Sequence, residues 1–321
     1  MKKNLLILIV ALICFIFLSG NIFLSYASNY LNVQDSGFTN LPVSVRAVGM
    51  GGAFVAIADD YSACYFNPAG LVQLSHSQLG STYTDLYGWG LLKHSFLAFV
   101  EPTPTMGSGG VSWNHLSANL EPEEWSYDLW AYSYAKIIYP KNLTLRNGFS
   151  SWGINLKYLR QIAPGEDASG YSIDLGYLNK GRKMSKMSKM SKISWGFNFQ
   201  DIFSQIDWST GRKEQIPSNL KFGFAWKASH KFLLAVDLDT SLKDLPKQMH
   251  LGGEWRISNN FKLRAGATKI FQKSANLALS IGMGFKLRLR EEGIRQVNFN
   301  YAFSNNEELG NTHRFSLSFG F

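Results

Sequence analysis

The chain has 321 residues and a formal net charge of +9, and 14% of its residues are aromatic. Its basic residues are scattered through predicted strands and turns, whereas a nucleic-acid-binding protein gathers positive charge on one face, so no nucleic-acid partner is expected. The six histidines lack metal-ligand spacing and there are only two cysteines. We therefore expect no metal site, disulfide framework or cofactor.

Residues 1–27 have the composition of an export signal. Met1–Asn4 carries two lysines, Leu5–Leu18 is apolar, and small residues stand at −3 and −1 of a cleavage after Ala27. The alternative is an uncleaved membrane anchor, which the interruption at 19–21 disfavours, since a spanning helix needs about 20 apolar residues. We expect export, with cleavage near Ala27.

Residues 28–76 precede the first predicted strand and are rich in small residues. Glycines here permit close approach and positive φ, and an Asn-Pro pair favours a turn. The positions singled out are Arg46, Gly49, Gly51, Gly52, Asp59, Asp60, Asn67, Pro68 and Ala69. Neighbouring carboxylates inside a protein need cations, so we expect Asp59 and Asp60 to meet Arg46 or one of Lys157, Lys221 and Arg264.

Two catalytic or cofactor interpretations of this region fail. Gly49-Met50-Gly51 begins like a dinucleotide fingerprint, but Phe54 occupies the third glycine position and no strand-helix unit surrounds it. Ser75-His76-Ser77 and His94-Ser95 place hydroxyls beside imidazoles, yet adjacent residues on a strand point to opposite faces. We expect no catalytic residue and predict a non-enzymatic protein.

The connection after the first strand is apolar where water would favour polar residues. It contains Tyr87, Trp89, Leu91 and Leu92. Such a surface could capture a hydrophobic ligand, or it could simply pack on the rim of the fold. The sequence leaves both readings open.

Residues 77–321 alternate between apolar and polar residues, a pattern with the period of a β-strand. In Leu220–Trp226, for example, apolar side chains interleave with Lys221, Gly223 and Ala225. Fourteen strands are predicted, at 77–84, 93–101, 108–115, 127–138, 149–160, 171–178, 193–200, 218–227, 231–239, 248–256, 260–268, 276–288, 294–304 and 312–321.

These strands predict an all-β fold, an antiparallel transmembrane β-barrel. No segment after residue 27 is apolar enough to span as a helix, and lipid then leaves only a closed sheet with apolar residues outward and polar residues inward. A soluble β-sandwich has the same period but would expose too many aromatic side chains. We expect short periplasmic turns at 229–230 and 258–260, and longer outer connections at 114–126, 201–217 and 240–246.

One connection repeats the triplet Met-Ser-Lys three times. It covers Met184–Lys192 and follows Arg182 and Lys183. A period of three fits neither helix nor strand, so it predicts a solvated periplasmic loop. A role in binding a peptide or a lipid headgroup is the alternative.

The last residues of the chain alternate strictly and stop on an aromatic residue. The apolar set is Phe315, Leu317, Phe319 and Phe321. This ending is typical of the final strand of bacterial outer-membrane barrels. We therefore expect the outer membrane as the location, with its lipids and the barrel assembly machinery as partners.

Residues Arg46–Leu71, with their glycines, Ala-Asp-Asp and Asn-Pro-Ala, resemble the amino-terminal block of the PorV/PorQ family, a branch of the FadL-type superfamily of fourteen-stranded barrels. The resemblance implies that 28–76 folds into the lumen as a hatch, inside a barrel of residues 77–321. It also implies a protein that passes or holds a hydrophobic small molecule. The alternative that it implies is an adaptor or shuttle of a type IX-like secretion system, with secretion proteins as partners.

Overall fold

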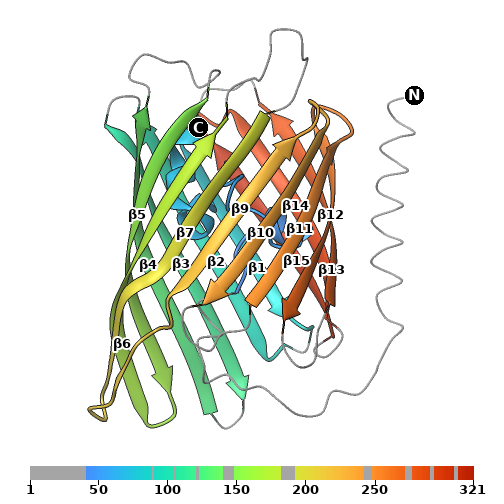
Figure 1. The fold of residues 1–321 in the computed structure, drawn as a ribbon. Helices are drawn as coiled ribbons and strands as arrows, with labels where there is room; N and C mark the ends of the chain where they lie inside the picture. The colour runs from blue at the N-terminus through green and yellow to red at the C-terminus, as the bar shows by residue number, and fades with distance from the viewer. Residues whose placement is uncertain are drawn as a thin grey trace. The chain divides into compact units, whose positions relative to one another are not determined.

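The computed structural model describes residues 41–321 except for a few turns, and these residues form a barrel of antiparallel strands (Figure 1). The turn positions outside the description are 89, 104–105, 121–122, 140–147, 182–191, 242–246, 272–276, 290–292 and 307–309. The predicted export signal and all of the Met-Ser-Lys repeat except Lys192 thus lie outside the described residues. Among the described residues, no helix is long and apolar enough to cross a membrane.

Fifteen strands follow one another in the part of the chain that is described, and fourteen of them are long. They are β1 (Gln78–Leu86), β2 (Leu92–Thr103), β3 (Gly107–Leu120), β4 (Glu123–Tyr139), β5 (Phe149–Ala163), β6 (Glu166–Lys180), β7 (Lys192–Trp208), β8 (Lys213–Glu214), β9 (Asn219–Lys227), β10 (Phe232–Ser241), β11 (Lys247–Arg256), β12 (Phe261–Phe271), β13 (Leu277–Arg288), β14 (Gln296–Asn306) and β15 (Gly310–Gly320). Each of the fourteen predicted ranges overlaps one long strand, and the two-residue β8 is an addition.

The long strands close into a ring of fourteen. Each pairs antiparallel with its neighbours along the chain, β7 pairs with β9, and β8 pairs only with the end of β7. The ring closes between β1 and β15, from Gln78 opposite Gly320 to Asp85 opposite His313. The predicted antiparallel barrel is confirmed. We call the side of the barrel at which β1 begins and β15 finishes the β1 end. The opposite side, where the β1–β2 turn lies, is the hairpin end.

The two faces of the wall differ as a transmembrane barrel requires. On β9, Phe222, Phe224 and Trp226 point outward and are 40–45% exposed, while Lys221 and Gly223 between them face the lumen. The outer face carries leucine, phenylalanine, tyrosine and tryptophan on successive strands. An apolar outer face is stable only in lipid, which is why this alternation accompanies barrel closure.

Cysteine labelling can test this assignment on one strand. Gln248 of β11 faces the lumen and lines a cavity, while Leu251 of the same strand points outward. We expect Gln248→Cys to react with a charged, membrane-impermeant maleimide and Leu251→Cys to react at least about tenfold more slowly, because lipid excludes the reagent. The native Cys64 is buried and serves as the background control. Equal rates at both positions would contradict the inward and outward assignment.

The predicted outer connections at 114–126 and 201–217 are largely strand, and that prediction is wrong. The strands β3 to β7 have 14 to 17 residues, while β1, β2 and the long strands from β9 onward have 9 to 12. About ten residues suffice to span a bilayer, so β3 to β7 project beyond it at the hairpin end, drawn at the bottom of Figure 1. Outside lipid a strand no longer needs an apolar outer face. The alternation of apolar and polar residues therefore stops, although the strand continues to pair with its neighbours.

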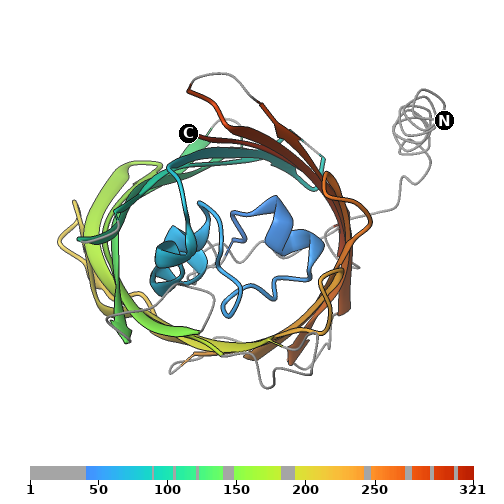
Figure 2. The same cartoon turned by 90° about the horizontal axis from the view of Figure 1, so that it is seen from above.

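Residues 41–77, which we call the inner segment, lie inside the ring of strands (Figure 2). They contain the short helices α2 (Val45–Gly49) and α3 (Ala63–Phe66) and the 3-10 helix η1 (Pro68–Gln73). The Ser44 side chain accepts a hydrogen bond from the Ala47 backbone and so caps α2. With single turns as its only helices, this segment depends on contacts with the wall for its conformation.

Glycines of the wall make those contacts close. A Cβ at Gly266 of β12 would overlap the backbone of Met50 and Gly51, and one at Gly153 of β5 would overlap that of Pro68 and Ala69. The glycines that approach inner-segment backbone in this way are Gly153, Gly223, Gly252, Gly266 and Gly282, whereas Gly80, Gly110, Gly176 and Gly196 approach its side chains. The strands therefore carry glycine where backbone meets backbone, a role that only a residue without a Cβ can fill.

Candidate functional site

A cluster of charged side chains attaches α2 to the wall. Arg46 donates from Nη1 to Asp59 (2.5 Å) and Asp60 (3.2 Å), and from Nε to Glu254 of β11 (3.0 Å). Glu254 also accepts hydrogen bonds from Lys262 (2.8 Å) and Arg264 (2.9 Å) of β12. Three cations thus meet three carboxylates, and this neutrality is what makes their burial tolerable. Of the cations considered from the sequence, Arg46 contacts both aspartates, while Lys157 and Lys221 pair elsewhere.

The surroundings of Asp59 and Arg46, the two charged residues that follow, favour the ionised form of each. Burial alone would raise the pKa of Asp59, but Arg46, with Lys180 and Lys262 further away, holds it below the ordinary value of 3.8. Burial likewise opposes the charge on Arg46, but Asp59, Glu254 and Asp60 together raise its pKa well above its usual range. The Asp59 carboxylate therefore contributes to the attachment fully above about pH 4 and loses that contribution as the pH falls through its lower folded-state pKa.

Acidification should loosen the inner segment reversibly. In planar bilayers we expect small-ion conductance to rise as the pH falls below about 4 and to recover on return to pH 7, because protonated Asp59 no longer pairs with Arg46. Asp59→Asn should already be leaky at pH 7 and should respond less to acid. A variant with an unchanged acid response would show that another group controls the opening.

Three strand residues hold the glycine turn that follows α2 and the residues after it. Gly51 and Gly52 adopt φ of +61° and +87°, which glycine tolerates. The carbonyl of Gly51 accepts hydrogen bonds from His250 Nδ1 (2.7 Å) and Thr268 Oγ1 (2.6 Å). Asp237 of β10 accepts from the backbone N–H groups that follow, Phe54 (2.6 Å) and Val55 (2.8 Å). The turn is thus fixed to β10, β11 and β12.

Asn67 and Pro68 begin η1 and contact the opposite wall. The Asn67 side chain accepts from the Ala69 N–H (3.1 Å) and donates to the carbonyls of Val55 and Tyr177 (3.1 Å each). Ser151 of β5 donates to the Ala69 carbonyl (2.7 Å). Asn67 therefore joins two parts of the inner segment to β6, which a turn-forming Asn alone would not require.

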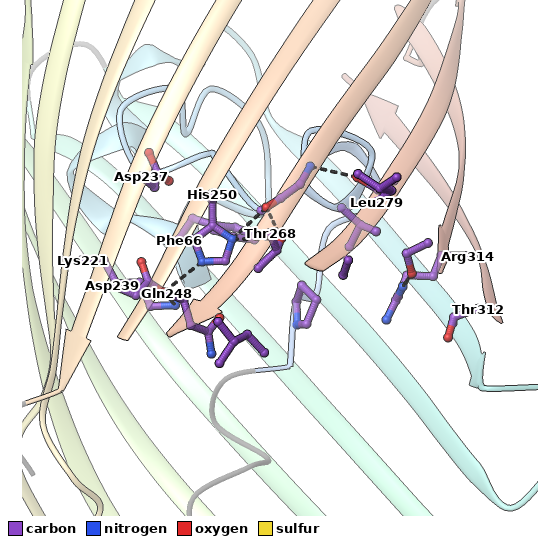
Figure 3. Close-up of a pocket in the computed structure, with 18 of the residues that line it drawn as sticks. Phe66, Lys221, Asp237, Asp239, Gln248, His250, Thr268, Leu279, Thr312 and Arg314 are labelled. Atoms are coloured by element: carbon purple, nitrogen blue, oxygen red, sulfur yellow. Dashed lines mark hydrogen bonds and ion pairs between the residues drawn. The ribbon is translucent and has the colours of Figure 1, made fainter. Parts of the chain in front are cut away.

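A cavity of about 420 Å³ lies between the inner segment and the wall at β9 to β15. Val48, Val55 and Phe66 of the inner segment form an apolar side, and Ile270 and Leu279 extend it. Figure 3 shows polar residues of the wall facing the same space, with Lys221, Asp239 and His250 at one end and Thr312 and Arg314 at the other. The cavity is amphipathic and is in the size range of small-molecule sites.

The two polar ends of the cavity differ in their pairing. At the first, Asp239 meets Lys221 (2.9 Å) and His250 Nε2 (3.5 Å). At the second, Arg314 of β15 is 94% buried and donates to Ser304 Oγ (2.8 Å), but its Nε has no partner, and no ion pair joins it to a carboxylate of the described chain. A buried cation without an anion is costly, so Arg314 is the polar group of the cavity most available to a ligand.

The predicted capture loop separates into different environments. Tyr87 lines the cavity, with φ of +66°, and its N–H donates to Thr312. Leu92 begins β2 and is buried against Leu86, whereas Leu91 is 39% exposed. Trp89 lies outside the described residues. Of the three described members, Tyr87 alone lines the candidate site.

The predicted terminal signal lies on the outer face. Phe315, Leu317 and Phe319 alternate on β15 with buried Ser316 and Ser318, and Phe321 follows the strand. This places the apolar set toward lipid. Recognition by an assembly machinery remains a prediction.

Ser75 and His76 do form a hydrogen bond, contrary to the expectation that they would point apart. The reason is that they lie in a turn before β1, not on a strand. Ser75 Oγ is 3.0 Å from His76 Nδ1, and the Gln296 amide nitrogen is 2.6 Å from His76 Nε2. An amide nitrogen only donates, so Nε2 is the accepting nitrogen of the neutral ring and Nδ1 carries the proton. A ring in this tautomer cannot take the proton of Ser75.

Sequence reasoning missed four residues of these sites: Asp237, His250, Glu254 and Arg314. The alternation already placed all four on the lumen face of their strands, so an ionisable residue at an inward position was the available signal. Their partners could not be read from the sequence, because each contact joins segments about 180 residues apart or more, or depends on cross-strand register. In the described part of the chain no group of three or more His, Cys, Asp and Glu is placed to hold a metal ion.

Comparison with known proteins shows the class of fold. No protein-family model and no curated protein matches the chain. A FadL homologue from Pseudomonas aeruginosa matches with a TM-score of 0.56 at 11% identity, over 88% of this chain and 98% of that one. The toluene transporter TodX of Pseudomonas putida matches at 0.53 and 11% over 85% and 96%, and the toluene transporter TbuX of Ralstonia pickettii at 0.51 and 11% over 90% and 98%. The fold is therefore that of FadL-like barrels, and membership of the PorV/PorQ family is not confirmed.

Proposed function

We propose that this protein is a non-enzymatic outer-membrane barrel that passes or holds a small hydrophobic molecule, with the inner segment acting as a hatch. The observation that carries the proposal is the cavity of about 420 Å³ between the inner segment and the wall. The similar solved barrels are described as transporters of toluene and a FadL homologue, which supports a transport role and offers no support for a secretion adaptor. The outer membrane follows from the apolar outer face of a closed barrel.

The shape of the cavity suggests how a molecule is held. An apolar body would lie against Val48, Val55 and Phe66, and a polar or anionic group would reach Arg314. The hatch blocks free passage through its contacts around the wall, because its atoms lie against glycines on nine strands and its backbone meets the backbone of five of them. Release on the far side then requires those contacts to loosen.

Two fluorescent probes of related shape test the site. N-phenyl-1-naphthylamine is neutral, while 8-anilinonaphthalene-1-sulfonate adds an anionic group to a similar aromatic body. We expect both to bind the protein in nanodiscs above the level of empty nanodiscs. Ala278→Trp, which fills the cavity from β13, should abolish both, and Arg314→Met should weaken the sulfonate about tenfold more than the amine, because only the sulfonate pairs with the guanidinium.

The control is Ala265→Trp, which adds the same bulk on the outer face of β12. It should bind both probes like the unmodified protein. If Ala278→Trp and Ala265→Trp bind equally well, the probes occupy lipid and the proposed cavity role is wrong. If Arg314→Met weakens both probes alike, the arginine shapes the cavity but does not recognise an anion.

A further inference from the structure

Four basic residues gather at the β1 end of the barrel, whereas the cavity lies toward the hairpin end of the same part of the wall. Arg256 ends β11, Lys286 and Arg288 end β13, and Arg295 precedes β14. Arg288 is the register partner of Gln296, and the backbone N–H of Arg295 donates to the carbonyl of Gly320 at 2.7 Å. We call these four residues the basic mouth. They flank two connections at this end of the wall, the β11–β12 turn and the β13–β14 turn.

The basic mouth lacks the carboxylate partners that other lumen cations have. Within the described ranges, none of its four members forms an ion pair, whereas the cations deeper in the lumen do, apart from Arg314. The paired set is Arg46, Lys157, Lys221, Lys262 and Arg264. The undescribed tip of the β13–β14 turn has the sequence Arg290-Glu291-Glu292. By formal charge alone, Arg256 and residues 286–295 carry five cations and two glutamates, and an external anion would neutralise this net positive charge.

The positive charge of the basic mouth affects the pKa of a neighbouring histidine. His76, which precedes β1, has its imidazole pKa held below the ordinary value by burial and then by the charges of Lys286 and Arg295. Burial and then the charges of Arg288 and Arg256 in turn lower the pKa of Lys286, so the charges of the two turns act on one another across the mouth. A set of like charges kept close without internal compensation raises the energy of the free protein and favours an anionic partner.

The orientation of the mouth indicates a partner in water. Arg256 follows the inward position Glu254, and Lys286 and Arg288 continue the inward positions Gly282 and Gly284. Their side chains therefore lie on the lumen side of the rim, while Trp255 and Phe285 on the same strands face lipid. A lipid headgroup would be met by cations on the outer side. The register of these three cations thus favours a soluble partner over the membrane surface, and Arg295, which precedes β14, adds its charge without a lumen-facing strand position.

The extent of the mouth indicates a large partner. From β11 to β14 there are three interstrand spacings of about 4.8 Å, so the charges are spread over roughly 14 Å. A single small anion would contact one or two of them, whereas a standard protein interface buries about 800 Å² on each side. We propose that the basic mouth docks an acidic surface of a soluble protein on the β1 side of the membrane. This inference does not rest on the proposed transport role.

The test uses the full chain in nanodiscs of zwitterionic phosphatidylcholine and a fluorescein-labelled peptide of twelve glutamates, with a Gly-Ser peptide of equal length as the neutral probe. The mouth variant carries Arg256→Gln, Lys286→Gln, Arg288→Gln and Arg295→Gln. The matched control removes four cations that lie on strands toward the hairpin end and point outward: Lys93→Gln, Arg160→Gln, Lys247→Gln and Lys269→Gln. Both variants lose the same charge, so they differ only in where it was.

We expect the glutamate peptide, but not the neutral one, to bind the unmodified protein in a salt-sensitive manner. The mouth variant should bind at least about tenfold more weakly and the control within about twofold, since complementary charge acts locally. No binding by the unmodified protein, or equal weakening in both variants, overturns the proposal. If the unmodified protein retains more phosphatidylglycerol than the mouth variant after extraction, the cations bind lipid, and the proposal is again overturned.

Folding is checked by the heat-dependent gel mobility of the barrel. Should the fourfold mouth variant not fold, Arg288→Gln with Arg295→Gln, the two most exposed members, replaces it. The expected loss is then about threefold, against no change for Lys93→Gln with Arg160→Gln. An unchanged affinity in the double mouth variant contradicts the proposal.

Discussion

Replacing Arg46 with methionine should release the inner segment while leaving the barrel folded. The substitution keeps the apolar bulk but removes the cation that Asp59 and Asp60 share, and it breaks one of three contacts to Glu254. Removing one member of a buried ion pair typically costs about 3–5 kcal/mol, because the partner is left buried and unpaired. The remaining contacts cannot easily offset such a loss in a region whose helices have only four to six residues.

Two measurements separate release of the segment from loss of the fold. The Arg46→Met protein should keep the heat-dependent gel mobility of a closed barrel. It should also show a higher bilayer conductance and faster protease cleavage within residues 41–77 than the unmodified protein. Arg46→Lys should fall between the two, because lysine keeps the charge but not the three-way geometry.

The matched control is Arg212→Met at the hairpin end. Arg212 also contacts two carboxylates, Glu166 at 3.8 Å and Glu214 at 3.0 Å, but its side chain is about half exposed. Exposed pairs of this kind contribute about 0–1 kcal/mol, so neither conductance nor cleavage should change. An Arg46→Met protein that behaves like Arg212→Met would show that the charge cluster does not hold the inner segment.

The barrel was predictable from the sequence because its determinants are local. Alternation along a strand such as β9 depends only on which side faces lipid, and it is visible in one run of residues. The same dependence on the lipid-facing side made the predicted ranges of β3, β4 and β7 too short at the hairpin end. Beyond the membrane the outer face of a strand may be polar, so the pattern disappears while cross-strand hydrogen bonds continue, as between Ala118 and Trp125.

The candidate site was only partly predictable because its contacts are not local. The small and charged residues at 46–69 were recognisable as a group, but the choice of Glu254, Asp237 and His250 as their wall partners depends on the register of β10 and β11. Arg314 has an inward position that the alternation gives, yet its lack of an anion is a property of the assembled lumen. Whether a charged lumen residue has a partner therefore depends on the tertiary structure.

Placing a methyl group on Gly266 should displace the inner segment as effectively as removing its charges. A Cβ at this position of β12 would overlap the backbone of Met50 and Gly51, and backbone cannot turn aside as a flexible side chain can. Gly51 has little freedom to yield, because its N–H donates to Ser280 and its carbonyl accepts from Thr268. Overpacking of this kind costs about 1–3 kcal/mol, and here the strain falls on the weakest element, the inner segment.

We therefore expect Gly266→Ala to raise bilayer conductance and to speed cleavage within residues 41–77, with the barrel still closed. The matched control is Gly253→Ala on the neighbouring strand β11, where a Cβ would point outward and meet no atom closer than 3.5 Å. That variant should be neutral or slightly stabilising, since alanine loses less backbone entropy than glycine. If both variants are equally silent, the inner segment does not depend on close backbone contact with β12, and the glycines of the wall serve strand geometry alone. If only Gly266→Ala is leaky, the same glycines that let the segment sit against the wall are what keep the lumen closed.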